Sequence, residues 1–120
     1  MMPIYWGIFV PNCGGKLDKV IGWQHVTYGF KTEYPEDIHG KPVDVKVVGY
    51  GNDGQNEAYL VMLPKWTKDI YSGSDVKHIT LSVAHGAKPV DSCKLTFEPL
   101  EPFILEGVFG YFDKDGVHLH

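Results

Sequence analysis

The sequence contains no arginine: all 11 of its basic residues are lysines, and 15 Asp and Glu residues give a net charge of −4. Bidentate recognition of phosphate by a guanidinium group is therefore excluded. The charge balance also excludes the broad basic surface that binds long nucleic acids. A phosphate group must be held by lysines, hydroxyls and backbone N–H groups, which favours a small, compact ligand.

Cysteines and long apolar segments are also scarce. Cys13 and Cys93 are too few for a disulfide scaffold, and their separation matches no zinc-binding pattern, so we expect reduced thiols. No apolar run approaches the roughly 20 residues of a membrane span. The start of the chain lacks the basic region and apolar stretch of a signal peptide. We therefore expect a cytoplasmic protein without a membrane partner, folded as one domain over residues 1–120.

Strand patterns dominate what is present. Residues 42–50 alternate between valines and charged side chains, which predicts a half-buried strand. A turn at 51–54 and an apolar run at 56–63 complete a predicted hairpin. Residues 16–22 have a brief helical spacing. Further strands are predicted at 4–10, 23–30, 77–83, 95–97 and 103–112. Without a βαβ rhythm, a doubly wound parallel sheet is not expected.

Two of these strands carry the same short motif, His-x-Thr, at His25–Thr27 and at His78–Thr80. Residues two apart on a strand share a face, so each copy presents an imidazole and a hydroxyl side by side. Six histidines in 120 residues can produce one such motif by chance. Two copies, each followed by an apolar or aromatic residue on a predicted strand, favour a functional interpretation.

The paired motifs resemble those of the 2H phosphoesterase superfamily. His78–Leu81, followed by Gly86–Val90, is also similar to the cyclic phosphodiesterase-like modules found with RNA-repair and tRNA ligase proteins. Phage anti-CBASS phosphodiesterases, which degrade cyclic oligonucleotide signals, belong to the same superfamily. The resemblance implies a small bilobal α+β fold, with two antiparallel sheets around a central cleft and few helices.

By this resemblance, His25 and His78 form the acid–base pair, and Thr27 and Thr80 bind the phosphoryl oxygens. Imidazole titrates near neutrality, so one copy can act as base and the other as acid. The sequence leaves open which histidine takes which role. The resemblance implies no cofactor and no metal.

Four further residues are candidates for substrate binding. Tyr5 and Tyr28 are able to stack on a nucleobase, or else belong to the core. Lys88 lies in a Gly-Ala-Lys-Pro segment and is a candidate phosphate contact, or an ordinary solvated lysine. Glu106 interrupts an apolar run; it is either a cleft carboxylate that orients a histidine or contacts a base, or the exposed face of an edge strand. Some phage members of the superfamily also use a glutamate beyond the second motif.

The sequence thus predicts a metal-independent phosphodiesterase acting on a compact or cyclic nucleotide phosphodiester. Its substrate would be a cyclic nucleotide or oligonucleotide signal, as in phage counter-defence, or the 2′,3′-cyclic phosphate at an RNA 3′ end. Long duplex nucleic acid is not expected as a partner, and the oligomeric state is left open. One alternative is a binding module that sequesters a cyclic nucleotide without turnover. Another is a protein-interaction domain in which the paired motifs are accidental.

Overall fold

The computed structural model describes residues 1–120, and eight antiparallel strands form one sheet. The helical segments are three short 3₁₀ turns. The order along the chain is β1 (Tyr5–Phe9), β2 (Lys19–Val20), β3 (His25–Phe30), η1 (Glu36–Ile38), β4 (Pro42–Asn52), β5 (Asn56–Met62), η2 (Lys65–Ile70), β6 (His78–Val83), η3 (Pro89–Lys94), β7 (Glu98–Asp113) and β8 (Gly116–His118). Within the sheet the order is β2-β6-β5-β4-β7-β1-β3, and β8 pairs with β7.

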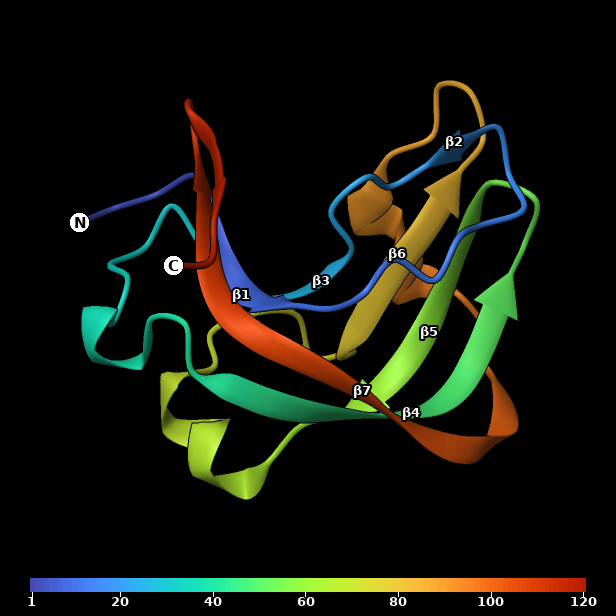
Figure 1. Cartoon of the computed structure of the whole chain (residues 1–120). Helices are drawn as coiled ribbons and strands as arrows, with labels where there is room; N and C mark the ends of the chain where they lie inside the picture. The colour runs from blue at the N-terminus through green and yellow to red at the C-terminus, as the bar shows by residue number, and fades with distance from the viewer.

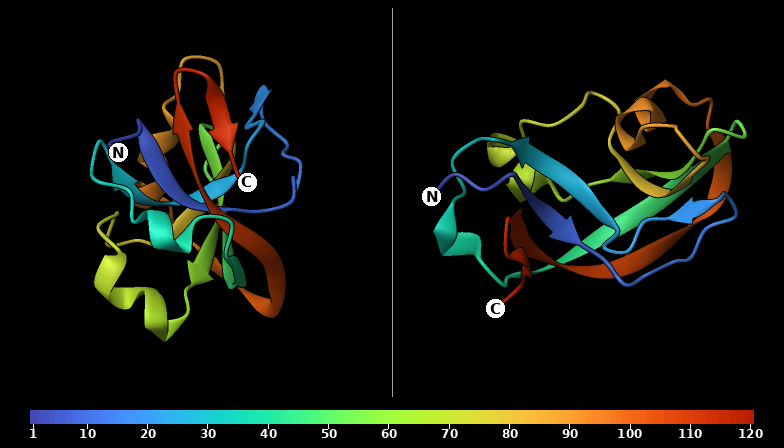
Figure 2. Two further views of the ribbon diagram at one scale, coloured as in Figure 1. Left: turned by 60° about the vertical axis from the view of Figure 1, so that its left-hand side comes forward. Right: turned by 90° about the horizontal axis from the view of Figure 1, so that it is seen from above.

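The expectation of an α+β fold with two sheets is wrong, because the fold is mostly β and its two halves share one sheet. β4 and β7 are 11 and 16 residues long, and they pair from Pro42↔Val108 to Tyr50↔Glu98. Seen from above, they run side by side across the molecule (Figure 2). This long ladder, with one bulge between Val47 and Gly49, joins what would otherwise be two lobes. No segment carries a sustained helical period, so no helix covers the sheet.

The sheet bends strongly, so that the molecule has two arms. In Figure 1, one arm carries β1 and the β7–β8 hairpin, and the other carries β2, β5 and β6. β3 and β6 contact each other between the arms, although no ladder joins them. The two strands that begin with the histidines of the His-x-Thr motifs are therefore brought together by the bend.

The core lies on the inner face of the bent sheet. Alternation in β4 buries Val43, Val45 and Val47, while the charged residues between them are exposed. Tyr28 and Phe109 are fully buried at its centre, with ring centroids 5.1 Å apart. At roughly 25 cal/mol per Å² of apolar surface, burial of this cluster is the main source of stability.

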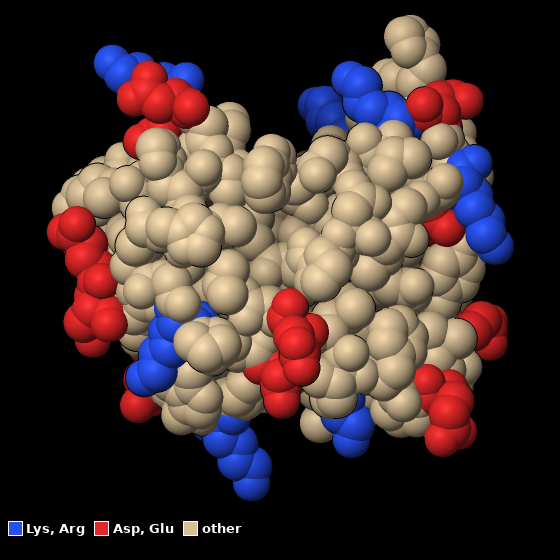
Figure 3. All heavy atoms as spheres, viewed as in Figure 1, with Lys and Arg blue, Asp and Glu red and all other residues tan.

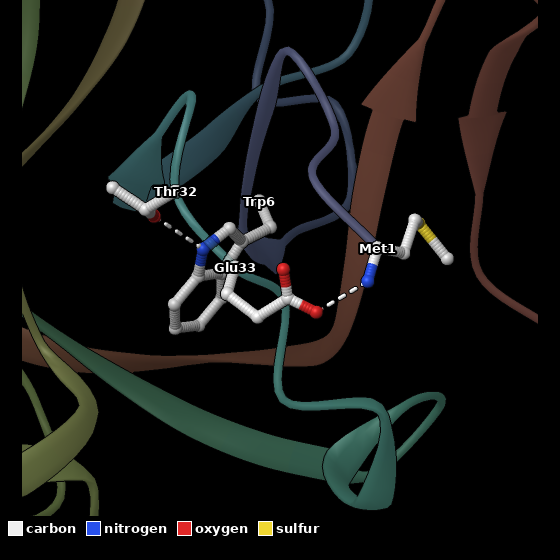
Figure 4. Close-up of polar contacts among 4 residues, drawn as sticks. All are labelled: Met1, Trp6, Thr32 and Glu33. Carbon is white, nitrogen blue, oxygen red and sulfur yellow. Dashed lines mark hydrogen bonds and ion pairs between the residues drawn. The ribbon is translucent and has the colours of Figure 1, made fainter.

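The N-terminal segment is attached to the turn that follows β3. The buried Trp6 ring donates from Nε1 to Thr32 Oγ1 at 3.0 Å, and the Met1 ammonium pairs with the Glu33 carboxylate (Figure 4). The two partners are loop residues: Thr32 is half-buried and Glu33 is exposed. These contacts hold β1 in register beside β3.

The brief helical spacing of residues 16–22 does not produce a helix; this segment contains the two-residue edge strand β2, whose Val20 is 42% exposed. The strand predicted at residues 95–97 is wrong, since β7 begins at Glu98. The 42–62 hairpin is confirmed. None of the helical segments has the length or apolar character needed to cross a membrane.

Candidate functional site

His25 and His78 have matching surroundings at the start of their strands. His25 Nδ1 lies 2.7 Å from the carbonyl oxygen of Trp23, and His78 Nδ1 lies 2.7 Å from that of Val76. In each case the acceptor is the residue two positions earlier. A carbonyl oxygen only accepts, so Nδ1 carries the proton in both rings. The Nε2 atom of each histidine is therefore left for proton transfer.

The backbone around the two motifs has an approximate twofold relationship. Ser72, in the segment before β6, donates its N–H to the carbonyl of Tyr28 at 2.8 Å. Ile21, in the segment before β3, donates its N–H to the carbonyl of Leu81 at 2.9 Å. Tyr28 and Leu81 each stand three residues after a motif histidine. Each His-x-Thr strand is thus supported by the segment that delivers the other one.

His25 is half-buried and packs against two aromatic rings. Its ring stacks on Tyr5 with centroids 4.4 Å apart, and Phe9 lies at 5.3 Å. This burial lowers the pKa of His25 to about 4, against the smaller opposing effect of the Trp23 carbonyl, and a positive charge on His78 lowers it further. His25 is therefore neutral at pH 7.

The two threonines differ in their contacts. Thr27 is half-buried and its hydroxyl has no hydrogen-bond partner inside the protein. Thr80 Oγ1 lies 2.9 Å from Ser92 Oγ and 3.2 Å from the carbonyl oxygen of Pro89. The Thr27 hydroxyl is therefore free to donate to a ligand, whereas Thr80 must exchange a contact with η3 to do so.

Lys88 is held close to Thr80 by its backbone. Asn56 is buried and donates from Nδ2 to the Lys88 carbonyl at 2.8 Å. Lys88 is also the residue before η3, where the Pro89 carbonyl meets Thr80. The backbone of Lys88 is therefore fixed, while its side chain is exposed.

The remaining candidates lie in different settings. Tyr5 is half-buried against His25 and belongs to the site. Tyr28 is fully buried and its hydroxyl donates to Thr67 Oγ1 at 2.8 Å, so it supports β3 from the core side and reaches no ligand. Glu106 is exposed on β7, opposite Asp44 of β4. It lies near Phe9 and Trp23, which contact His25, and not against the His25 ring itself.

Sequence reasoning missed two buried polar residues that hold the loop after β1. Gln24 accepts from the Cys13 N–H at 2.7 Å and donates to the carbonyls of Gly14 and Leu81. Glu57 accepts from the Lys16 N–H at 2.8 Å and from the Ser82 hydroxyl at 2.7 Å. Both side chains are almost completely buried. No local pattern marks either residue, because their partners stand between 7 and 57 residues away in the chain.

The Glu57 carboxylate is held as an anion. Burial alone would raise its pKa, but hydrogen bonds from Tyr50, Ser82 and the Lys16 N–H together lower it. A bulge in the β5–β6 pairing separates Ser82 from the face of His78 and Thr80, and Ser82 also accepts from the Leu17 N–H at 3.1 Å. This network fixes residues 13–17 across the end of β6.

A space-filling view in the orientation of Figure 1 shows a notch between the two arms (Figure 3). The arm that carries β2, β6 and η3 bears lysine side chains at its rim, and the opposite tip bears charges of both signs. The notch itself is lined by uncharged groups. Its position corresponds to the space between the arms, where β3 and β6 meet.

Residues of metal-ligand type do not gather in the site. No group of three or more His, Cys, Asp or Glu residues is placed to hold a metal ion. His118 instead lies 2.9 Å from an Asp113 oxygen across the β7–β8 hairpin.

No family model matches the chain, and no curated protein matches it.

Proposed function

We propose that the protein is a metal-independent phosphodiesterase of the 2H type that hydrolyses a compact or cyclic nucleotide phosphodiester. The observation that carries this proposal is the matched pair of imidazoles, His25 and His78, each with Nδ1 bonded to a carbonyl oxygen at 2.7 Å. Both rings are pre-oriented with Nε2 free. Proton transfer by two such groups replaces what a metal ion supplies in other phosphodiesterases.

His25 is the general base. Its pKa of about 4 keeps the ring neutral at pH 7, so Nε2 carries a lone pair. It takes a proton from a water molecule as the water oxygen bonds to phosphorus. Stacking on Tyr5 holds the ring plane during this step.

His78 is the general acid. When the bond between phosphorus and the leaving ribose oxygen breaks, His78 Nε2 donates its proton to that oxygen. The electron pair of the broken bond stays on the oxygen, which becomes a ribose hydroxyl. The Thr27 hydroxyl donates to a phosphoryl oxygen as negative charge develops, and Thr80 does the same after releasing Ser92 or Pro89.

The charge of the protein supports a small substrate. With 11 lysines, no arginine and a net charge of −4, the protein has too few clustered cationic groups to bind a long polyanion. The lysines beside the notch, with Lys88 fixed next to Thr80, are enough for one or two phosphates. Two settings agree with this: a cyclic nucleotide or oligonucleotide signal, and the 2′,3′-cyclic phosphate at an RNA end.

A substrate panel tests the proposal. The protein would be incubated with 2′,3′-cyclic and 3′,5′-cyclic mononucleotides, cyclic dinucleotides and trinucleotides, an RNA with a cyclic end and a plain duplex. Chromatography should show product from at least one cyclic compound and none from the duplex. His25→Ala and His78→Ala should each abolish that product.

Two other results are informative. If the cyclic compounds bind tightly but return unchanged, the protein sequesters its ligand and is not an enzyme. If none of them binds, the paired motifs have no nucleotide function.

A further inference from the structure

Beside the residues that surround His25 lies a groove of about 340 Å³ that the catalytic scheme does not use. It is formed by the loop after β1, the segment before β3, the middle of β7 and the C-terminal tail. Its lining residues are Phe9, Val10, Pro11, Asn12, Gly22, Trp23, Glu106, Val108 and Leu119. The surface is mainly apolar, and it contains one carboxylate.

The groove is continuous with the surroundings of His25. Phe9 lines it and also packs against the His25 ring at 5.3 Å. Trp23 lines it and supplies the carbonyl that holds His25 Nδ1. The register Val108↔Phe9↔His25 crosses three adjacent strands on one face of the sheet. A nucleotide with its phosphate at His25 would therefore have its base in this groove.

Trp23 provides a stacking surface there. Its side chain is 55% exposed, although it stands at the edge of an apolar groove. An exposed aromatic ring beside a phosphate site is the usual platform for an unpaired base.

Glu106 provides the polar contact. It stands two residues from Val108, so it shares the face of His25, at roughly 12 Å between Cα atoms from strand geometry. It has no ion-pair partner, and it lies directly opposite Asp44 on β4. Like charges placed opposite one another on a sheet are unfavourable unless a ligand uses them.

Resting on the proposed function, we infer that this groove is a base-binding subsite that prefers guanine. An ionised carboxylate only accepts hydrogen bonds. Guanine presents two adjacent donors, N1–H and the N2 amino group, to the two carboxylate oxygens. Adenine and cytosine each place a ring-nitrogen acceptor beside their amino group, and uracil flanks its N3–H with two carbonyls. Guanine is therefore the base whose edge fits Glu106 without repulsion.

The test compares kcat/KM for the 2′,3′-cyclic or 3′,5′-cyclic phosphates of guanosine, adenosine, cytidine and uridine, whichever linkage is turned over. The guanosine compound should be favoured by about 10- to 100-fold, the usual worth of a bidentate base contact. Glu106→Gln should remove this preference and leave the other three substrates nearly unchanged. Glu101→Gln, an exposed glutamate on the same strand outside the groove, should behave as wild type.

A binding measurement separates this inference from the proposed function. Titration with GMP and with AMP, followed by calorimetry, should show tighter binding of GMP, lost in Glu106→Gln, and weaker binding of both in Trp23→Ala. Turnover without base preference, or a Glu106→Gln variant that keeps its preference for guanosine, would overturn the guanine subsite and leave the phosphodiesterase intact. If no cyclic nucleotide is hydrolysed, the phosphodiesterase fails, and GMP binding alone decides whether the subsite exists.

Discussion

The ring of Tyr5 lies stacked on the ring of His25, with 4.4 Å between their centroids. Tyr5 stands four residue pairs away from His25 in the β1–β3 ladder, and by alternation it shares a face of β1 with Phe9, the direct partner of His25. It removes one face of the imidazole from water. Burial of this kind lowers the pKa of His25 to about 4 and so determines which proton-transfer role the ring is able to take.

The pH dependence of activity should follow from this pKa. A base must be neutral, so kcat/KM should fall as the pH drops through about 4, well below the ordinary value of 6.5. Tyr5→Ala exposes the ring to water, raises its pKa and should move this acidic limb to higher pH. The limb is measured from pH–rate profiles of both proteins. An identical acidic limb in Tyr5→Ala would show that the stacking does not control His25.

The same pKa has a consequence for folding. His25 binds a proton less readily in the folded state than in the unfolded chain, so stability is fully present above about pH 6.5 and is lost as the pH falls toward about 4. The free energy of unfolding, measured by urea denaturation, should therefore fall more steeply between pH 7 and 4 for the wild type than for His25→Gln. Parallel curves would argue that His25 is readily protonated in the folded protein.

The two histidines should contribute comparably to turnover. His25→Ala and His78→Ala should each lower kcat by about 10²–10⁴-fold, the usual size of an acid–base contribution. Circular dichroism would establish that the folds are intact. His85→Ala, at an exposed histidine beyond the motifs, is the matched control and should retain full activity. Normal turnover in either motif variant removes that residue from the mechanism.

The two threonines should separate catalysis from stability. Thr27→Val removes a hydroxyl without internal partners, so it should slow turnover and leave the free energy of unfolding nearly unchanged. Thr80→Val also removes the contacts with Ser92 and Pro89 and should cost about 0.5–1.5 kcal/mol of stability as well. Urea midpoints and initial rates measure the two effects. Equal midpoints for the two variants would contradict the asymmetry seen in their contacts.

Glu57 should be a structural residue whose loss loosens the loop after β1. Glu57→Gln replaces one carboxylate oxygen with an amide nitrogen, which cannot accept a hydrogen bond. The variant therefore loses either the bond from Tyr50 to Oε2 or the bonds from Ser82 and the Lys16 N–H to Oε1. We expect destabilisation by about 1–3 kcal/mol, measured by denaturant unfolding. Because its pKa is lowered, the contribution of Glu57 is present above its ordinary pKa and lost as the pH falls below it. Glu101→Gln is the exposed control and should be neutral.

Chelation tests the absence of a metal requirement. Turnover should be unchanged in excess EDTA, since the two imidazoles perform both proton transfers in the proposed mechanism. Activity that disappears on chelation and returns with added zinc or manganese would replace this mechanism with a metal-dependent one.

The sequence by itself determined the local features of this protein. Alternation in residues 42–50 predicted β4, because a period of two puts valines on one face and charges on the other. The same rule placed His25 beside Thr27 and His78 beside Thr80 on their strands. The absence of arginine and the net charge of −4 argued against a long polyanion as ligand, which stays a prediction. Each of these depends only on residues close together in the chain.

Tertiary structure decided everything that depends on distant segments meeting. Nothing local shows that β4 and β7 pair along their length, so one sheet forms where two were expected. The low pKa of His25 depends on Tyr5, 20 residues away, and Glu57 depends on Ser82 and Lys16. The groove of Trp23 and Glu106 likewise joins segments more than 80 residues apart. Burial and hydrogen bonding act through space, so these properties exist only once the sheet has bent.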